Sequence, residues 1–427
     1  MSAVRDARRL LRPFHGELVS LLRALVRTDS VAVPPDGNET PAQRVLEAWL
    51  KRKRVPVETY DTAFLERSKH PLARKDRRYR GRRNLVSRTP GTGGGRSLLL
   101  SGHVDTVPPG RTPWKHGGPF SGAVSGGRLY GRGSWDMKGG LVAQFAVAAA
   151  LKRAGLRLRG DLVCESIVDE EFGGGGGTLA GRLRGDQADA CAVAEGTNYA
   201  VIRATRGGSV FDVICEAGDP MGYVSREEVV SPAVPMGRVL GWVDGWVARR
   251  KRVERSGGPY ADFPDPAPVQ VLAVEANTFD REVPWSVPML GRIRAYFQFL
   301  PGEDVEAVLR EVEASLHEFA RGDAFFRSHP VRFQRVLDPP LHGHEQPADH
   351  PWTACLLGAA QGIVGPEAQV TASQWPCDAF IHQRFGMPTL LFGPKGAGSH
   401  NANEYVELRS VLRTAETYLA AALEWCA

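Results

Sequence analysis

Three short apolar segments each lead directly into a histidine or an acidic residue, and this arrangement limits the folds available to the chain. They are residues 97–101 (SLLLS) before His103, residues 162–168 (LVCESIV) before Asp169, Glu170 and Glu171, and residues 190–194 (ACAVA) before Glu195. An Ala-rich apolar segment at 139–153 has the length of a helix, and Gly155 follows it as a typical helix end. Short buried strands that alternate with helices form a mostly parallel sheet, whose sites lie at the carboxyl ends of the strands. The sequence therefore predicts an α/β fold with histidine and carboxylate side chains gathered at one sheet edge.

A different pattern begins near residue 207. Strand-like segments at 209–215 and 292–299 accompany helical segments at 234–250 and 302–320, and together they indicate a small α+β unit. Residues 330–427 return to the first pattern, with a strand at 389–392 and a final helix at 406–425. We therefore predict one α/β domain built from residues 1–206 and 323–427, interrupted by an inserted α+β domain at 207–322.

Composition excludes several classes of protein. The chain has 427 residues, of which 42% are hydrophobic and 24% charged, so it is neither disordered nor fibrous. Its longest apolar run, at 141–151, is far shorter than the roughly 20 residues of a membrane helix, so no membrane association is expected. The N-terminus lacks the apolar region of a signal peptide. Six cysteines are scattered without a close pair, which favours a reducing cytoplasm.

The net charge is +6, and residues 67–83 hold nine lysines and arginines. A solvated loop is the simplest interpretation of this basic segment, and docking of an acidic partner or of nucleic acid is the alternative. No aromatic-interleaved basic motif or zinc knuckle favours nucleic acid.

Six side chains that follow strands or lie in Gly-rich turns are candidates for metal chemistry. They are His103, Asp136, Glu170, Glu171, Glu195 and His400. Each alone has an ordinary structural explanation, as a strand end, a turn former or a helix cap. Together, two imidazoles and four carboxylates provide one nitrogen ligand and one terminal carboxylate for each of two metals, a bridging carboxylate and a base. Such nitrogen and oxygen ligands suit Zn²⁺, with Co²⁺ or Mn²⁺ as alternatives.

In these motifs the chain resembles the M20 co-catalytic metallopeptidases, which include acetylornithine deacetylase, succinyl-diaminopimelate desuccinylase, aminoacylase and carboxypeptidases. The resemblance runs from LVRTDSV near Leu25 through GHVDTVP, GRGSWDMKGG, the DEE segment and AEGT to GMPTLLFGPKGAGSHNANEYV. It implies a two-zinc α/β catalytic domain in which an inserted lid or dimerisation domain occupies residues 207–322. It also implies a homodimer formed through that insert.

The resemblance also implies a role for each candidate. His103 and Glu195 would bind one metal, Glu171 and His400 the other, Asp136 would bridge both, Glu170 would be the general base, and Asp105 would orient His103 through its side chain. Residues 137–140 would place Asp136 at a helix start, and residues 393–398 would line the substrate pocket with backbone amides. Glu195, where an Asp also occurs in the family, is closer to the deacetylase and desuccinylase branch.

The sequence departs from the family where the lid normally carries an oxyanion-binding histidine, because that position falls at Gly222. Tyr223, Ser225 and Arg226 are the nearest replacement donors. The lid arginine that recognises a substrate carboxylate is also missing; Gln298 lies near its position, and Arg292 and Arg294 could replace it. Near the catalytic motifs, Trp135 stands where a small residue is usual, and Gly196 where a proline is usual.

These features predict a zinc-dependent amidohydrolase that cleaves an N-acyl amino acid or a small peptide. Two alternatives remain at this point. One is a specialised biosynthetic enzyme on the same scaffold, whose substrate is unusual or bound to an acidic carrier protein that docks on the basic segment 67–83. The other is a non-catalytic metal-dependent binding protein, which an intact Glu170 argues against because a binding protein needs no base.

Overall fold

The computed structural model describes residues 2–173, 175–216, 231–252, 258–276 and 288–427. These residues form two compact units. The first comprises Met1–Ala204, Glu345–Ser373 and Cys377–Ala427, and the second comprises Thr205–His344 with Gln374–Pro376. The chain leaves the first unit after Ala204 and returns to it at Glu345, and the short segment Gln374–Pro376 also belongs to the second unit.

A mixed sheet forms the centre of the first unit, with nine strands among the described residues. Its order is β15–β10–β17–β9–β5–β8–β4–β3, with β16 beside β10. The strands are β3 (Glu58–Asp61), β4 (Arg83–Thr89), β5 (Leu98–His103), β8 (Leu162–Ile167), β9 (Cys191–Val193), β10 (Val201–Thr205), β15 (His344–Glu345), β16 (Val370–Ala372) and β17 (Thr389–Leu391). The pairs β8–β5, β5–β9 and β9–β17 are parallel, whereas β3 and β4 join antiparallel at one side. The predicted mostly parallel sheet is confirmed for the centre of the sheet, and antiparallel pairs lie at its sides.

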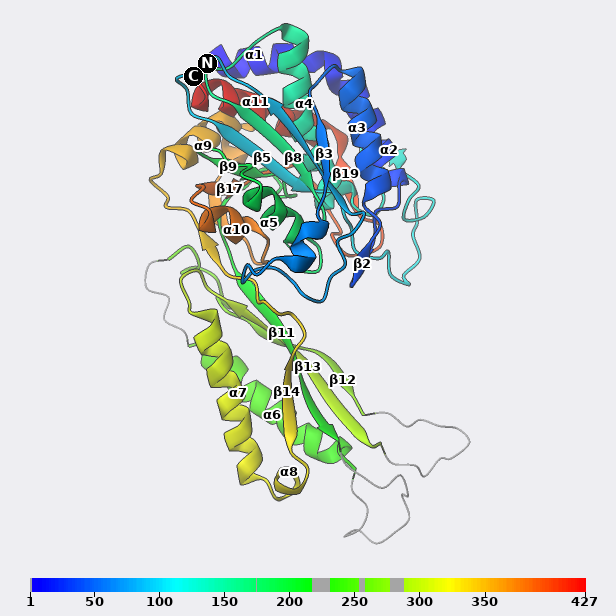
Figure 1. Cartoon of the computed structure of the whole chain (residues 1–427), viewed down its shortest axis with the longest axis vertical. Helices are drawn as coiled ribbons and strands as arrows, with labels where there is room; N and C mark the ends of the chain where they lie inside the picture. Colours follow the sequence, from blue (N-terminus) through cyan, green and yellow to red (C-terminus); the bar gives the residue numbers. More distant parts are fainter. Residues whose placement is uncertain (1, 174, 217–230, 253–257, 277–287) are drawn as a thin grey trace. The chain divides into compact units, whose positions relative to one another are not determined.

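The strands of the parallel centre are buried on both faces. Every residue of β5, β8 and β9 is buried, as expected for a parallel sheet covered by helices. The helices of this unit are α1 (Ser2–Leu11), α2 (His15–Arg27), α3 (Thr40–Arg52), α4 (Gly139–Ala154), α5 (Gly176–Leu183), α9 (Pro351–Val364), α10 (Ala379–Arg384) and α11 (Leu408–Trp425). Helix α4 packs on β5 and β8, α11 packs on α4, α9 and α1, and α5 packs on α10 (Figure 1). None of the described helices combines the length and apolar character that a membrane span requires.

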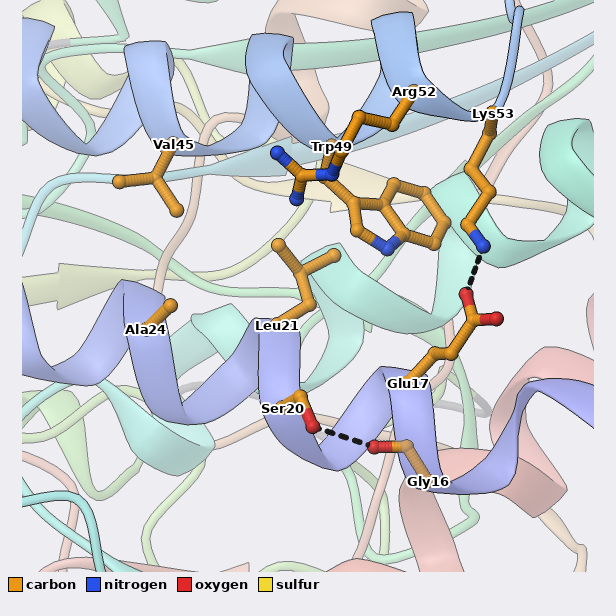
Figure 2. A pocket seen from close by; sticks show the side chains of 9 residues that line it. All are labelled: Gly16, Glu17, Ser20, Leu21, Ala24, Val45, Trp49, Arg52 and Lys53. Atoms are coloured by element: carbon orange, nitrogen blue, oxygen red, sulfur yellow. Dashed lines mark hydrogen bonds and ion pairs between the residues drawn. The ribbon is translucent and has the colours of Figure 1, made fainter.

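The two N-terminal amphipathic helices α2 and α3 pack against each other. Helix α2 buries Leu21 and Leu25, and α3 buries Trp49. Figure 2 shows the hollow that remains between them, with a volume of about 370 Å³. An ion pair between Lys53 and Glu17 closes one end of it. None of the predicted site residues lines this hollow.

A small antiparallel sheet, in the order β18–β19–β7–β6, lies in the same unit. Its strands are β6 (Ala123–Ser125), β7 (Arg128–Tyr130), β18 (Gly396–Ala397) and β19 (Tyr405–Glu407). Tyr130 of β7 pairs with Tyr405 of β19, although 275 positions separate them in the chain. This pairing brings the turn after β7 next to the turn before β19.

The second unit is an antiparallel sheet covered by helices. The sheet has the order β12–β13–β11–β14, and its strands are β11 (Gly207–Glu216), β12 (Val269–Glu275), β13 (Leu290–Phe299) and β14 (Val331–Arg335). The helices are α6 (Ala233–Arg250), α7 (Val305–Gly322) and α8 (Ala324–Ser328). A core that includes Phe211, Phe297 and Leu309 lies between sheet and helices.

The boundaries of this unit differ from those predicted. The sequence pattern placed the end of the insert at residue 322, but the unit continues to His344 because β14 pairs with β11 from Phe211 to Cys215. The sequence analysis did not predict strands β12 and β14. In β12 only Val269 is buried and the other six residues are exposed, so it has neither the alternating pattern of a half-buried strand nor the continuous apolar run of a buried one.

The basic segment 67–83 is not simply a solvated loop. Arg74, Arg77 and Arg82 are buried: Arg77 and Arg82 form ion pairs with the buried carboxylates of Asp169 and Glu39, and Arg74 pairs with the exposed Asp76. The other six lysines and arginines of the segment are exposed.

Candidate metal centre

Three of the predicted site segments meet because β5, β8 and β9 are neighbouring parallel strands. His103 ends β5 and pairs in register with Ile167, the last residue of β8. Glu170 and Glu171 follow β8 by three and four residues, and Glu195 follows β9 by two. The carboxyl ends of parallel strands lie at one edge of a sheet, so these side chains converge there as the sequence predicted.

The small antiparallel sheet brings the remaining two candidates to the same place. Asp136 lies in the turn after β7, and His400 lies in the turn before β19. His400 has a φ of +60°, in a turn closed by a hydrogen bond from the Asn401 N–H to the Gly398 carbonyl at 2.9 Å. A positive φ is uncommon for a residue with a side chain and is often found at functional sites.

His103 is at the centre of the first cluster. Its Nε2 lies 3.3 Å from Oδ1 of Asp136, 3.6 Å from Oε1 of Glu195 and 3.8 Å from Oε2 of Glu170. His103 is 1% exposed, so its imidazole is enclosed by these carboxylates and their neighbours.

His400 is at the centre of the second cluster. Its Nε2 lies 2.7 Å from Oε2 of Glu171 and 3.2 Å from Oδ2 of Asp136. The two oxygens of Asp136 therefore reach the two imidazoles separately, Oδ1 toward His103 and Oδ2 toward His400. The Ser399 hydroxyl also donates a hydrogen bond to Oδ2. This is the arrangement expected of a carboxylate that bridges two sites.

The donor atoms fit two metal ions. His103, Asp136 and Glu195 form one group whose ligand atoms all lie within 4.8 Å of one another, and Asp136, Glu171 and His400 form a second. Nε2 of His103 and Oε1 of Glu171 are buried and make no hydrogen bond to the residues that the structure describes. A buried polar atom without a partner is costly, and one cation in each ligand group would provide a partner for each of these two atoms. One imidazole with carboxylates for each ion is a donor set suited to Zn²⁺, Co²⁺ or Mn²⁺.

The crowding of carboxylates changes their proton affinities. Burial raises the pKa of Glu170 and of Glu195 well above the usual range, and the neighbouring carboxylates raise them further. Burial likewise raises the pKa of Glu171 to about 7. Burial opposes charge on Asp136 too, but the neighbouring imidazoles of His103 and His400 outweigh this and lower its pKa. The hydrogen bonds to Asp136 and Glu171 raise the pKa of His400 well above the usual value for imidazole.

These shifts predict that metal binding releases protons. His400 and Glu171 both have raised pKa values in the metal-free protein, so they retain protons near neutral pH, which a cation must displace. The apparent affinity for Zn²⁺ should therefore rise between pH 6 and pH 8. Calorimetric titration in two buffers with different ionisation enthalpies measures the released protons. A binding enthalpy that is the same in both buffers, with an affinity independent of pH, would contradict the prediction.

Asp105 contacts His103 through a different atom from the one predicted. Nδ1 of His103 lies 3.0 Å from the backbone carbonyl oxygen of Asp105 and 3.6 Å from its carboxylate. The other carboxylate oxygen of Asp105 accepts hydrogen bonds from the N–H groups of Glu170 (3.0 Å) and Glu171 (3.1 Å). The side chain of Asp105 therefore holds the turn that carries both glutamates, while its backbone faces the imidazole.

Glu404 is a site residue that sequence reasoning missed. Its buried carboxylate accepts hydrogen bonds from the Arg132 guanidinium (2.7 Å) and from the N–H groups of Gly133 (2.9 Å), Trp135 (2.9 Å) and Asp136 (3.1 Å). It thus fixes the backbone of the turn that presents Asp136. The motif containing Glu404 was noticed, but nothing in the sequence distinguishes a buried Glu from an exposed one.

The indole ring of Trp135 packs directly against Gly196. A Cβ atom at Gly196 would lie 2.4 Å from Nε1 of Trp135, and one at Gly396 would lie 2.6 Å from the same indole ring. The indole N–H donates to the Pro394 carbonyl at 2.9 Å. The large residue at 135 therefore requires the absence of a side chain at 196, which explains two departures from the family pattern at once.

Residues 393–398 were predicted to line the substrate pocket with backbone amides, and three of those amides already have acceptors within the protein. The N–H groups of Gly393, Lys395 and Gly396 each donate at 2.9 Å to a side-chain oxygen of the protein, from Thr197, Ser410 and Asn198. Gly393 serves instead for close approach, since a Cβ there would lie 1.9 Å from the Glu195 carbonyl oxygen.

The candidate substrate-binding residues of the insert either bond to other residues of the protein or lie outside the described residues. Arg294 forms a two-pronged ion pair with Asp212 at 2.8 and 2.9 Å, and Arg292 pairs with Glu275. Gln298 is buried and accepts a hydrogen bond from Arg206 at 2.8 Å. The lid position Gly222 and the replacement donors Tyr223, Ser225 and Arg226 lie outside the described residues.

An α/β sheet whose carboxyl edge carries two histidine–carboxylate clusters with one shared aspartate has the architecture of a two-metal hydrolase. The chain belongs to peptidase family M20/M25/M40, which it matches over residues 99–424. It is accordingly a metal-dependent amidohydrolase or peptidase.

Individual relatives agree with this assignment. The chain is 26% identical to N-formyl-4-amino-5-aminomethyl-2-methylpyrimidine deformylase of Halalkalibacterium halodurans, over 96% of this chain and 94% of that protein. It is 30% identical to succinyl-diaminopimelate desuccinylase of Gluconobacter oxydans, over 76% of this chain and 80% of that protein. Its fold matches human carnosine dipeptidase 1 with a TM-score of 0.75 at 15% identity, over 99% and 98% of the two chains.

Proposed function

We propose that this chain is a two-zinc deacylase that cleaves the amide bond of a small N-acyl amine or N-acyl amino acid. The observation that carries the proposal is the position of Asp136, whose two oxygens reach His103 at 3.3 Å and His400 at 3.2 Å. His103 and Glu195 would hold one ion, Glu171 and His400 the other, and Asp136 both. Divalent ions supply Lewis acidity in such a site, which lowers the pKa of water and polarises a carbonyl group. Co²⁺ and Mn²⁺ fit the same donors.

Glu170 is the proposed general base. It belongs to neither ligand group, yet its Oε2 lies 3.8 Å from Nε2 of His103, at the edge of the first cluster. It would take a proton from the water whose oxygen attacks the carbonyl carbon. It would return that proton to the amine nitrogen as the C–N bond breaks, so that a carboxylic acid and a free amine are released. Asp105 holds the backbone of Glu170 in place for both transfers.

Two features define the substrates to test. Two relatives, which align over 96% and 76% of this chain, are named as a deformylase and a desuccinylase. Arg292, Arg294 and Gln298, the residues considered for binding a substrate carboxylate, are bonded to protein partners. We therefore favour an acylated amine that need not carry a carboxylate. Such a substrate is also compatible with the alternative of a specialised biosynthetic enzyme on the same scaffold.

The test is turnover measured by mass spectrometry on a panel of N-formyl, N-acetyl and N-succinyl amines, the matching amino acids and dipeptides. Protein loaded with Zn²⁺ should cleave at least one class, and chelator should abolish the cleavage. A folded, metal-loaded protein that cleaves none of them would contradict the deacylase proposal and favour the non-catalytic binding protein. Acyl compounds attached to an acidic carrier protein form a further arm, because six cations of segment 67–83 are exposed.

We further propose a homodimer formed through the second unit. Strand β12 is an edge strand of its sheet, and Val271, Leu272 and Val274 are 40%, 51% and 55% exposed. An edge strand with exposed apolar side chains readily pairs with another strand.

We also propose a cytoplasmic location, since all six cysteines are free thiols.

The dimer proposal predicts the effect of charges on β12. Light scattering should give twice the chain mass for the wild-type protein and a single chain mass for a variant that combines Leu272→Lys and Val274→Lys. Val234→Lys, at a 75% exposed apolar residue of α6 in the same unit, serves as the control for added charge alone. A wild-type protein that is monomeric at micromolar concentration would contradict the proposal.

A further inference from the structure

The basic segment 67–83 folds back onto the acidic turn that follows β8. Asp169 is 2% exposed and receives three hydrogen bonds from this segment. Arg77 donates through Nε at 3.3 Å and Arg82 through Nη2 at 3.1 Å, both to Oδ1, and the Tyr79 hydroxyl donates to Oδ2 at 2.9 Å. Side chains of a segment that the sequence suggested to be a solvated loop therefore surround Asp169, the residue directly before Glu170.

The same segment also holds the loop beyond the two glutamates. Arg77 donates through Nη2 to the Phe172 carbonyl at 3.0 Å, and Arg74 donates through Nη1 to the Gly173 carbonyl at 3.1 Å. The loop lies so close to the segment that a Cβ at Gly176 would be 2.3 Å from the Tyr79 hydroxyl oxygen. Segment 67–83 thus contacts the chain both before and after the pair Glu170–Glu171.

The turn needs such support because its conformation is unusual. Successive side chains in an extended strand point to opposite faces, so Glu170 and Glu171 could not both reach the site if β8 continued. Asp169 instead adopts a φ of +62°, which is uncommon for a residue with a side chain. The N–H groups of both glutamates then point to one carboxylate oxygen of Asp105. A strained conformation persists only where its surroundings fix it.

Two arginines of the segment are themselves held by carboxylates of the first unit. Arg82 donates through Nε to both carboxylate oxygens of Glu39, at 3.0 and 3.1 Å, and Glu39 is fully buried next to the start of α3. Arg74 forms a two-pronged pair with Asp76 at 2.9 and 2.7 Å, which fixes the direction of its guanidinium.

We propose that Arg77, Arg82 and Tyr79 are positioning residues that hold Asp169 in its left-handed conformation and thereby direct Glu170 and Glu171 into the metal centre. They touch neither the donor clusters nor the reacting atoms. Their effect passes through the turn to the base and to one ligand. The proposal rests on the proposed function for the role of Glu170, but the position of Glu171 can be tested with metal alone.

The experiment compares Tyr79→Phe, Arg77→Ala and Arg77→Lys with the control Arg78→Ala. Arg78 lies in the same segment, and its side chain is 70% exposed. Two readouts are used at a temperature at which every variant is folded. The first is the visible absorption spectrum of protein titrated with Co²⁺, which reports the ligand geometry at Glu171 and His400 without any substrate. The second is kcat and KM for the best substrate of the panel.

Arg77→Ala should change the Co²⁺ spectrum and lower kcat by about 10- to 100-fold with KM nearly unchanged, because misplacement of a catalytic group by about 1 Å has effects of this size. Tyr79→Phe should have a smaller effect in the same direction, Arg77→Lys should restore part of kcat, and Arg78→Ala should match wild type. Unchanged spectra and unchanged kcat in both Tyr79→Phe and Arg77→Ala would overturn the proposal. If wild type cleaves no substrate, the proposed function fails, and the Co²⁺ spectra still decide whether Arg77 and Tyr79 position Glu171.

Discussion

Glu170→Gln should lower kcat by about 10²- to 10⁴-fold, the range that general acid–base catalysis contributes, and leave the metal content unchanged. The substitution preserves the size of the side chain and removes only its ability to accept a proton. Glu170 lies outside both ligand groups, so both ions should remain bound. Activity on the cleaved panel substrate and metal content by mass spectrometry measure the two effects on one preparation.

Glu47→Gln is the matched control for this substitution. Glu47 lies on α3 and pairs with Lys51 one helical turn away, so its loss should leave kcat within the error of the assay. A Glu170→Gln variant that loses metal in proportion to its activity would show that Glu170 is a ligand instead of a base.

Asp136→Ala should reduce bound metal from two ions per chain to less than one, whereas His400→Ala and His103→Ala should each retain about one. The reason is geometric, since Asp136 belongs to both ligand groups and each histidine belongs to one. Activity of Asp136→Ala should fall by more than the roughly 10- to 100-fold typical of losing an outer-shell partner of a metal ligand. Metal analysis after dialysis provides the measurement.

Ser399→Ala is the control for this series. Its hydroxyl also bonds to Asp136, but it supplies no member of either ligand group, so it should keep two ions per chain. Equal metal loss in Asp136→Ala and His400→Ala would contradict a bridging role for the aspartate.

The parts of the fold that the sequence predicted well are those with strong local patterns. The apolar run at 97–101 became β5, and the Ala-rich run at 139–153 became α4 (Gly139–Ala154), because burial on all sides leaves a continuous apolar signal. The convergence of His103 with Glu195 followed from their positions at the carboxyl ends of predicted parallel strands. The pairing of β7 with β19, which delivers Asp136 and His400, has no local signal, and only the family resemblance joined these residues.

The sequence failed where function depends on long-range partners of charged residues. Arg77 and Arg82 looked like members of a solvated basic loop, yet they bury their charges against Asp169, about 90 positions away. The same holds for Glu404, which lies about 270 positions from the turn that it fixes. Charge patterns in sequence show how many ionic groups exist, but not which of them are satisfied inside the protein.

The measurement that tests the central claim most directly is a titration of metal-free protein with Zn²⁺ while hydrolysis of the best panel substrate is followed. The two ligand groups around Asp136 predict no turnover without metal and a rise to full activity that ends at two equivalents per chain. Release of protons during the same titration would accompany the rise. Turnover that persists in protein shown to contain no metal would contradict the account.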